Sequence, residues 1–154
     1  MSDPDGYLAS VRSEISQGDI FEGITVFRPG LDGVPPSPPT EVVRGLLVTH
    51  DCEFDKPRTR YCVIAQVRSL VSVDGGTQAN VRQNRVLSAF FLPALRDAMP
   101  DSFADFRDIS SVLKDELIRL DANALRVVSL DDAAREALQE QLVRFFVREP
   151  PAAD

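Results

Sequence analysis

The order of the secondary-structure signals constrains the fold of this chain most, because short apolar runs come first and a long amphipathic stretch comes last. The runs are rich in Val, Ile and Phe, which favour β-strands, and turn or charged residues separate them. They predict strands over residues 20–27, 41–49, 61–67, 85–92 and 103–112. This order predicts a mainly β protein with helices (α+β), a small barrel that a C-terminal helix completes.

The C-terminal stretch gives the clearest helix signal. Ser129 is the expected N-cap and Asp132 the expected third helical residue, where a carboxylate complements the unpaired N–H groups. Glu149 and the prolines after it end the helix. Its apolar face repeats at helical spacing, at Ala134, Leu138, Leu142 and Phe145.

Weaker signals complete the pattern. Residues 7–15 predict a short N-terminal helix, residues 113–120 a second short helix, and residues 125–128 an extended piece. Residues 70–73 are expected to continue the third strand as far as a turn at 74–76. Residues 28–40 contain five prolines and two glycines, which predicts a long loop. The expected organisation is a segment over 1–17, one barrel domain over 18–149 and a tail over 150–154.

Composition narrows the class of protein. The 154-residue chain is 44% hydrophobic, enough for one core, and has no apolar run of the roughly 20 residues that span a bilayer. The first residues lack the basic and apolar regions of a secretory signal, so we expect a cytoplasmic protein without a membrane interaction. The net charge of −7 counts against nucleic-acid binding, although five arginines cluster in the middle of the sequence: Arg58, Arg60, Arg68, Arg82 and Arg85.

From Gly18 to about Phe146 the chain resembles the MazF/PemK family of toxin ribonucleases. The resemblance lies in four signals in the family's order. They are Gly18-Asp19-Ile20, the strand that begins at Arg44, the apolar strand that begins at Cys62, and a strand and short helix before the capped C-terminal helix. It implies an SH3-like barrel, a homodimer, and an antitoxin or other protein as partner.

The resemblance also implies an activity, cleavage of single-stranded RNA without a metal or other cofactor, in a toxin–antitoxin or defence system. Arg44 corresponds to the family arginine and would stabilise the charge on the phosphorus in the transition state. His50 or Ser69 would assist proton transfer. Arg58, Arg60 and Arg68 would line a groove for the phosphates. The chain departs from the family at two places, because Arg68 stands where the family has a threonine and Gly45 replaces a proline.

Two alternatives stay open. The chain could keep the barrel without the chemistry and act as a protein-binding module, which the departures and the acidic balance favour. It could also bind zinc through His50, Cys52 and Cys62, although their spacing matches no usual zinc motif. The blander interpretation of these three residues is a polar strand end with two reduced cysteines. We therefore predict no metal site in the leading interpretation.

Overall fold

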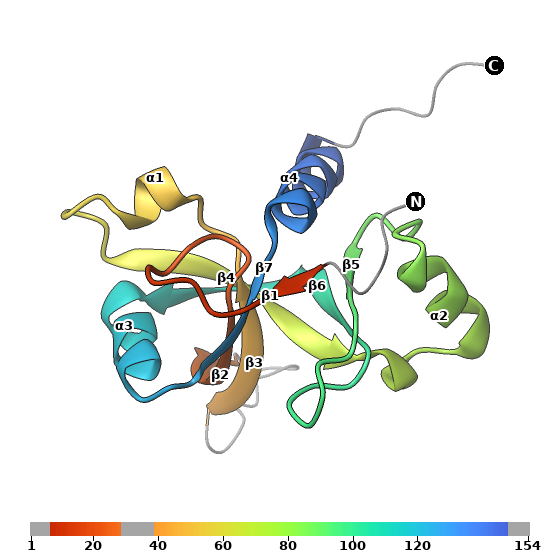
Figure 1. Ribbon diagram of the computed structural model, residues 1–154, viewed down its shortest axis with the longest axis horizontal. Helices are drawn as coiled ribbons and strands as arrows, with labels where there is room; N and C mark the ends of the chain where they lie inside the picture. Colours follow the sequence, from red (N-terminus) through yellow and green to blue (C-terminus); the bar gives the residue numbers. More distant parts are fainter. Residues whose placement is uncertain (1–6, 29–38, 148–154) are drawn as a thin grey trace.

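The computed structural model describes residues 7–28 and 39–147. These contain seven strands in one antiparallel sheet of order β1-β7-β2-β3-β4-β6-β5, curled into a half-barrel (Figure 1). The long strands are β2 (Ile20–Phe27), β3 (Thr40–Leu47), β4 (Tyr61–Ser69) and β6 (Ser102–Leu113), and the short ones are β1 (Leu8–Ala9), β5 (Ala89–Leu92) and β7 (Arg126–Leu130). The predicted class, mainly β with helices, is confirmed.

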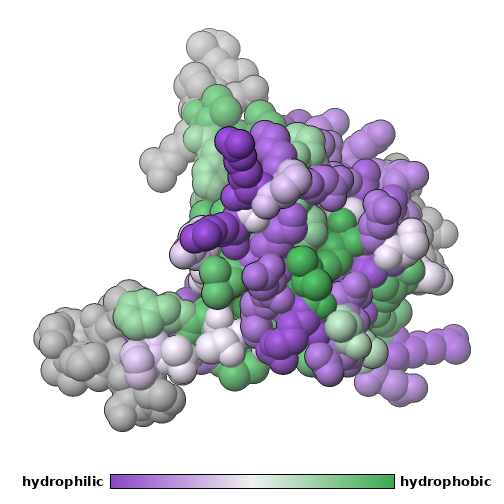
Figure 2. Space-filling view, turned by 90° about the vertical axis from the view of Figure 1, so that its left-hand side faces the viewer, coloured by the Kyte–Doolittle hydropathy of each residue, from purple (hydrophilic) through white to green (hydrophobic). Residues whose placement is uncertain are grey.

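The helices occupy the connections and the C-terminal end. They are α1 (Asp51–Phe54), α2 (Gly75–Arg82), α3 (Lys114–Ala122) and α4 (Asp132–Val147), with a 3₁₀ turn over Leu70–Ser72. In Figure 1, α1 and α3 lie toward the left end of the molecule and α2 toward the right end. Figure 2 views the molecule from the α1 and α3 side, where hydrophilic residues separate smaller hydrophobic patches. No helix among the described residues is long and apolar enough to cross a membrane.

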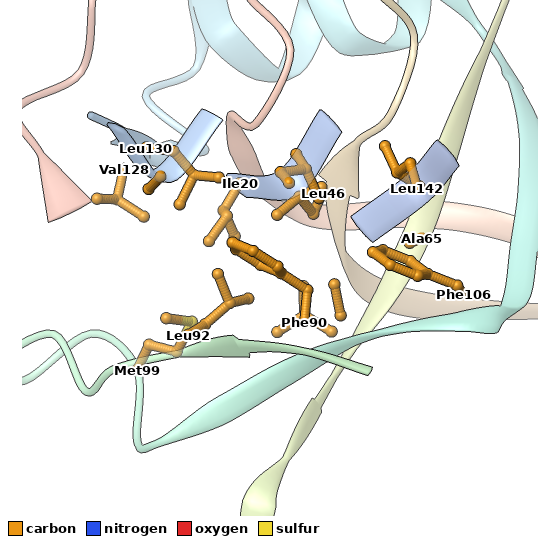
Figure 3. Packing of buried hydrophobic residues seen from close by; sticks show 14 residues of the cluster. Ile20, Leu46, Ala65, Phe90, Leu92, Met99, Phe106, Val128, Leu130 and Leu142 are labelled. Carbon is orange, nitrogen blue, oxygen red and sulfur yellow. The ribbon is translucent and has the colours of Figure 1, made fainter. Parts of the chain in front are cut away.

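Each face of the sheet carries its own core, because side chains alternate along a strand. The first core joins the sheet to α4, and Figure 3 shows its side chains converging from the strands and the helix. Phe90 and Phe106 are its largest buried side chains. The second core packs α1 and α3 against the opposite face, around Phe21, Ile64 and Leu117.

The expected C-terminal helix forms, and its apolar face is placed as predicted: Ala134, Leu138 and Leu142 are buried and Phe145 packs against them. Its predicted start is wrong. Ser129 is buried in β7, and Asp131 caps the helix, since its carboxylate accepts a hydrogen bond of 2.7 Å from the backbone N–H of Ala134. Asp132 is the first helical residue rather than the third.

The predicted N-terminal helix is wrong. Residues 7–15 form the two-residue strand β1 and irregular chain, because hydrogen bonds to the sheet satisfy this backbone instead. The Asp131 N–H donates to the Tyr7 carbonyl, and the Arg12 N–H donates to the Ser129 hydroxyl. Tyr7 and Leu8 still pack against the first core and Ile15 against the second, and the Tyr7 ring stacks on Phe90 with 6.0 Å between ring centroids.

Three further predictions need correction. Residues 70–73 turn into a 3₁₀ helix instead of continuing β4. The turn expected at 74–76 is the start of α2, because the Asp74 carboxylate accepts from the Thr77 N–H and caps the helix. Only Ala89–Leu92 of the strand predicted over 85–92 is extended. The loop predicted over 28–40 lies mostly outside the described residues.

A buried ion pair connects these elements. The Arg126 guanidinium on β7 donates 2.9 Å to the Asp19 carboxylate ahead of β2, and the side chains are 3% and 0% exposed. The same guanidinium donates to Asp121 and to the carbonyls of Glu14 and Arg12. The pair therefore fixes the N-terminal segment and the end of α3 to the sheet.

Replacing Asp19 by Ala should reduce the free energy of unfolding by about 3–5 kcal/mol, because it removes the fully buried carboxylate that pairs with the buried Arg126 charge. Urea unfolding of both proteins measures the loss. Glu53→Gln serves as the control, since its partner Lys56 is exposed and the exposed pair should contribute little. A loss below about 1 kcal/mol for Asp19→Ala would show that the pair is not needed for the fold.

Candidate functional site

Arg44 lies on β3 and forms an ion pair with Glu22 on β2. Its Nε donates to the Glu22 carboxylate, and its Nη2 donates 3.1 Å to the backbone carbonyl of Ala98. Both side chains are partly open to solvent, with 23% of Arg44 and 31% of Glu22 exposed. A cation and a potential proton acceptor are therefore side by side at a surface that a ligand can reach.

A β-bulge lies where Glu22 faces Arg44. The register between β2 and β3 shifts between the Phe21–Gly45 pair and the Ile24–Val43 pair, so that Glu22 and Gly23 together face Arg44. Gly23 has φ of +76°, which an L side chain adopts only with strain. Glu22 follows Phe21, which belongs to the second core, so alternation along the strand places Glu22 on the face of the sheet that carries Arg44.

Gly45 is required by packing rather than by the backbone conformation. A Cβ atom built there would lie 2.7 Å from the Ile24 Cδ1 and 3.0 Å from the Ile64 Cδ1, both in the second core. The side chains of Ile24 on β2 and Ile64 on β4 cover Gly45 from both sides, which gives the glycine at this position a local reason. This packing also confirms that Arg44, the neighbour of Gly45, points to the opposite face.

Ser69 lies on the same face as Arg44. On β4, Ile64 and Gln66 belong to the face of the second core, so Ala65, Val67 and Ser69 belong to the other. The connection over residues 93–101 runs past both positions: Ala98 accepts from Arg44, and Asp101 accepts from the N–H of Leu70, the residue after Ser69. The structure thus brings Arg44, Glu22 and Ser69 to one face.

His50 lies elsewhere, in the connection that follows β3. It caps α1, and its Nδ1 lies 3.2 Å from the Cys52 N–H nitrogen and 3.2 Å from the Cys52 Sγ. No hydrogen bond or ion pair joins His50 to Arg44 in the described part of the chain. The predicted pairing of these two residues in one site is therefore not observed.

The predicted phosphate-binding arginines are dispersed. Arg68 lies on the face opposite Arg44, where its guanidinium contacts the carboxylates of Asp105 and Asp108. Arg28 donates to the same Asp108 and to Gln66. Arg58 and Arg60 are exposed in the connection between α1 and β4. Arg68 is thus neutralised within the protein, and these residues do not form one groove with Arg44.

The three proposed zinc ligands are not assembled. His50 and Cys52 are adjacent and exposed, but Cys62 is 1% exposed within the second core. Across residues 7–28 and 39–147, no group of three or more His, Cys, Asp or Glu side chains could hold a metal ion. The zinc hypothesis therefore has no ligand set in this part of the chain.

Sequence reasoning missed Glu22. It identified Arg44 but looked for its proton-transfer partner at His50 and Ser69, since neither the bulge nor the strand pairing is visible as a periodic pattern. The signal that was present is Gly23, because an isolated glycine within a strand pattern often marks a bulge. Neither a scan against protein-family models nor a search of curated proteins gives a match to the chain.

Asp108 should make the stability of the fold depend on pH. The hydrogen bond from Arg28 holds the pKa of Asp108 below its ordinary value of 3.8, against the opposing effect of burial. A depressed carboxyl pKa stabilises the folded state above the ordinary pKa, and this stabilisation is lost as the pH falls through the folded value. The free energies of unfolding of the parent and of Asp108→Asn should therefore show their full difference from about pH 5 to 7. This difference should become smaller as the pH falls below about 3.8. A difference that is constant with pH would contradict the assignment.

The two cysteines should differ in reactivity. Cys52 is exposed, whereas burial in the second core raises the pKa of the Cys62 thiol despite the nearby Lys114 charge. Iodoacetamide should therefore modify the native protein once, at Cys52, and the urea-unfolded protein twice. Peptide mass spectrometry identifies the sites, and Cys52→Ser is the control that should remain unmodified until it unfolds. Modification of native Cys62 would show that this core opens readily.

Proposed function

We propose that the protein is a MazF/PemK-like endoribonuclease that cleaves single-stranded RNA without a metal, with Arg44 and Glu22 at its site. The observation that supports it is the half-exposed Arg44–Glu22 pair, with Ser69 on the same face. RNA cleavage by its own 2′-hydroxyl needs a proton acceptor and a cation near the phosphate, and this pair supplies both. The SH3-like barrel, the homodimer and an antitoxin partner belong to the same proposal.

The reaction would proceed by transfer of the 2′-hydroxyl proton to the Glu22 carboxylate. The 2′-oxygen then attacks the adjacent phosphorus, and the bond to the 5′-oxygen breaks. The products are a 2′,3′-cyclic phosphate and a 5′-hydroxyl, whose oxygen takes a proton from water. Glu22 then gives its proton to the hydroxide that remains and becomes a carboxylate again. Arg44 would leave part of its contact with Glu22 and donate to the phosphate oxygens as their charge increases. Ser69 would donate a hydrogen bond to the same phosphate.

The test is cleavage of a long single-stranded RNA in EDTA by the parent protein and three variants. Arg44→Ala should reduce the rate on the order of 10²–10³-fold, as expected when a transition-state donor is removed. Glu22→Gln should reduce it on the order of 10²–10⁴-fold, because the amide cannot accept the proton. Arg119→Ala is the matched control, since Arg119 lies exposed on α3 and pairs only locally with Glu116.

Circular dichroism must show that each variant is folded. The proposal is supported if the parent and Arg119→Ala cleave the RNA and Arg44→Ala and Glu22→Gln do not. Full activity of folded Arg44→Ala would remove Arg44 from the mechanism. No cleavage by the folded parent would overturn the ribonuclease proposal.

A protein-binding module is the second candidate function. Two large apolar side chains on neighbouring strands favour it: Phe27 is 67% exposed and Val42 is 69% exposed. They lie on the Arg44 face, since their positions alternate with those of the second core. This candidate predicts that the folded protein leaves RNA intact in EDTA and that Phe27→Ser with Val42→Ser abolishes capture of a protein partner.

A further inference from the structure

A pocket lies away from the Arg44–Glu22 pair, between α4 and the chain that leads from α2 into β5. Its volume is about 620 Å³, within the range of small-molecule sites in proteins. The residues that line it come from four parts of the chain: Tyr7 near the N-terminus, residues 82–85 at the end of α2, Phe91 on β5, and residues of α4. Nothing in the proposed ribonuclease chemistry uses this pocket.

Hydrogen bonds hold the walls of the pocket in place. The Gln141 side chain on α4 is 8% exposed, and its amide donates to the carbonyls of Val86, Leu87 and Ala89. Asn84 adopts a φ of 51°, which asparagine tolerates, and its side-chain carbonyl accepts 2.8 Å from the Phe91 N–H. The connection is thereby fixed both to α4 and to β5, so the pocket exists before a ligand binds.

Three of the lining residues are arginines, in a protein of net charge −7. Arg82 is held by Asp101, and its guanidinium lies 5.6 Å from the centroid of the Phe91 ring. Arg85 and Arg144 form no ion pair with a carboxylate in residues 7–28 and 39–147. Two guanidinium groups without an ion pair, at a pocket whose lining includes three arginines and one carboxylate, indicate an anionic ligand.

The rest of the lining is partly apolar. Tyr7 and Ala137 contribute to it together with Phe91, and stacking on Phe90 orients the Tyr7 ring. A flat aromatic group on a ligand can pack against such a wall. An inorganic anion would use only the arginines and leave this wall without a partner. The combination matches a ligand that joins a phosphate to an aromatic base.

We propose that this pocket binds a nucleoside monophosphate, with the phosphate at Arg85 and Arg144 and the base toward Tyr7. Glu140 also lines the pocket and carries a negative charge, so it should oppose the phosphate. The proposal is independent of RNA cleavage, because it involves none of Arg44, Glu22 and Ser69. A free nucleotide and the 5′-phosphorylated end of an RNA share this chemistry.

Isothermal titration calorimetry with the full chain tests the proposal. The titrants are AMP, UMP, adenosine, inorganic phosphate, and a short RNA with and without a 5′-phosphate. A nucleoside monophosphate should bind at least tenfold more tightly than adenosine or inorganic phosphate, since each of these offers only half of the ligand. Binding by free AMP or UMP assigns the pocket to free nucleotides. Binding only by the 5′-phosphorylated RNA assigns the same pocket to RNA ends.

The variants test the roles of the lining residues. Arg85→Ala and Arg144→Ala should each weaken binding roughly tenfold, the usual effect of losing one charge-assisted hydrogen bond. Glu140→Gln should strengthen binding, which a merely structural residue would not do. Arg119→Ala, an exposed arginine on α3, should leave it unchanged.

Three results would overturn the proposal. One is the absence of saturable binding of any of these titrants to the folded protein at millimolar concentration. Another is nucleotide binding that neither Arg85→Ala nor Arg144→Ala weakens, with both variants folded. The third is inorganic phosphate binding as tightly as AMP and UMP, which would mark an adventitious anion site only. None of these results depends on whether the protein cleaves RNA.

Discussion

The ion pair between Asp19 and Arg126 is the interaction on which the rest of the structure depends. Burial acts to lower the pKa of Arg126, but the hydrogen bonds and charges of Asp19 and Asp121 outweigh it, so the pKa is raised. Removing two charges from water is costly unless their hydrogen bonds are satisfied. Here the guanidinium also donates to the carbonyls of Glu14 and Arg12, so the pair can only form when the N-terminal segment, β7 and α3 are in place.

Backbone hydrogen bonds at Gly18 and Asp19 connect this ion pair to the strands that carry the candidate site. Its backbone carbonyl accepts 2.9 Å from the Leu47 N–H, and the Gly18 N–H donates 2.8 Å to the Leu47 carbonyl. These bonds set the start of β2 against the end of β3. In this register Phe21 pairs with Gly45, so Glu22 lies beside Arg44. A slip of one residue would exchange the faces of the sheet and separate them. The geometry of the candidate site therefore depends on the Asp19–Arg126 pair, although neither residue belongs to the site.

The sequence predicted the parts of the fold that depend on local patterning. The strand over Ile20–Phe27 has the predicted limits, and the apolar face of α4 is placed as predicted, because burial on one face leaves a periodic signal. Prediction from the sequence was wrong where tertiary contacts decide the local structure. Residues 7–15 have helical spacing but hydrogen-bond to β7, and Asp74 looks like part of a turn but caps α2. The partner of Arg44 was missed because the pairing of β2 with β3, which leaves no periodic pattern in the sequence, decides which residue faces it.

The arginines of this acidic chain fall into two groups: those that pair with carboxylates of the protein and those that do not. Arg28, Arg68 and Arg126 meet carboxylates within the fold, so a ligand would have to displace an internal ion pair to use them. Arg85 and Arg144 line a preformed pocket without a carboxylate partner among the described residues, and their charge is available to a ligand.

Arg44 is intermediate between these groups, since its one carboxylate partner, Glu22, is itself partly exposed. An anion that binds Arg44 would compete with Glu22 and release a carboxylate next to the bound phosphate. That release is what a base for the 2′-hydroxyl requires. The connection over residues 93–101 runs from this position to the pocket beside α4, because Ala98 accepts from Arg44 and Asp101 holds Arg82. One loop thus anchors an arginine at each of the two candidate sites.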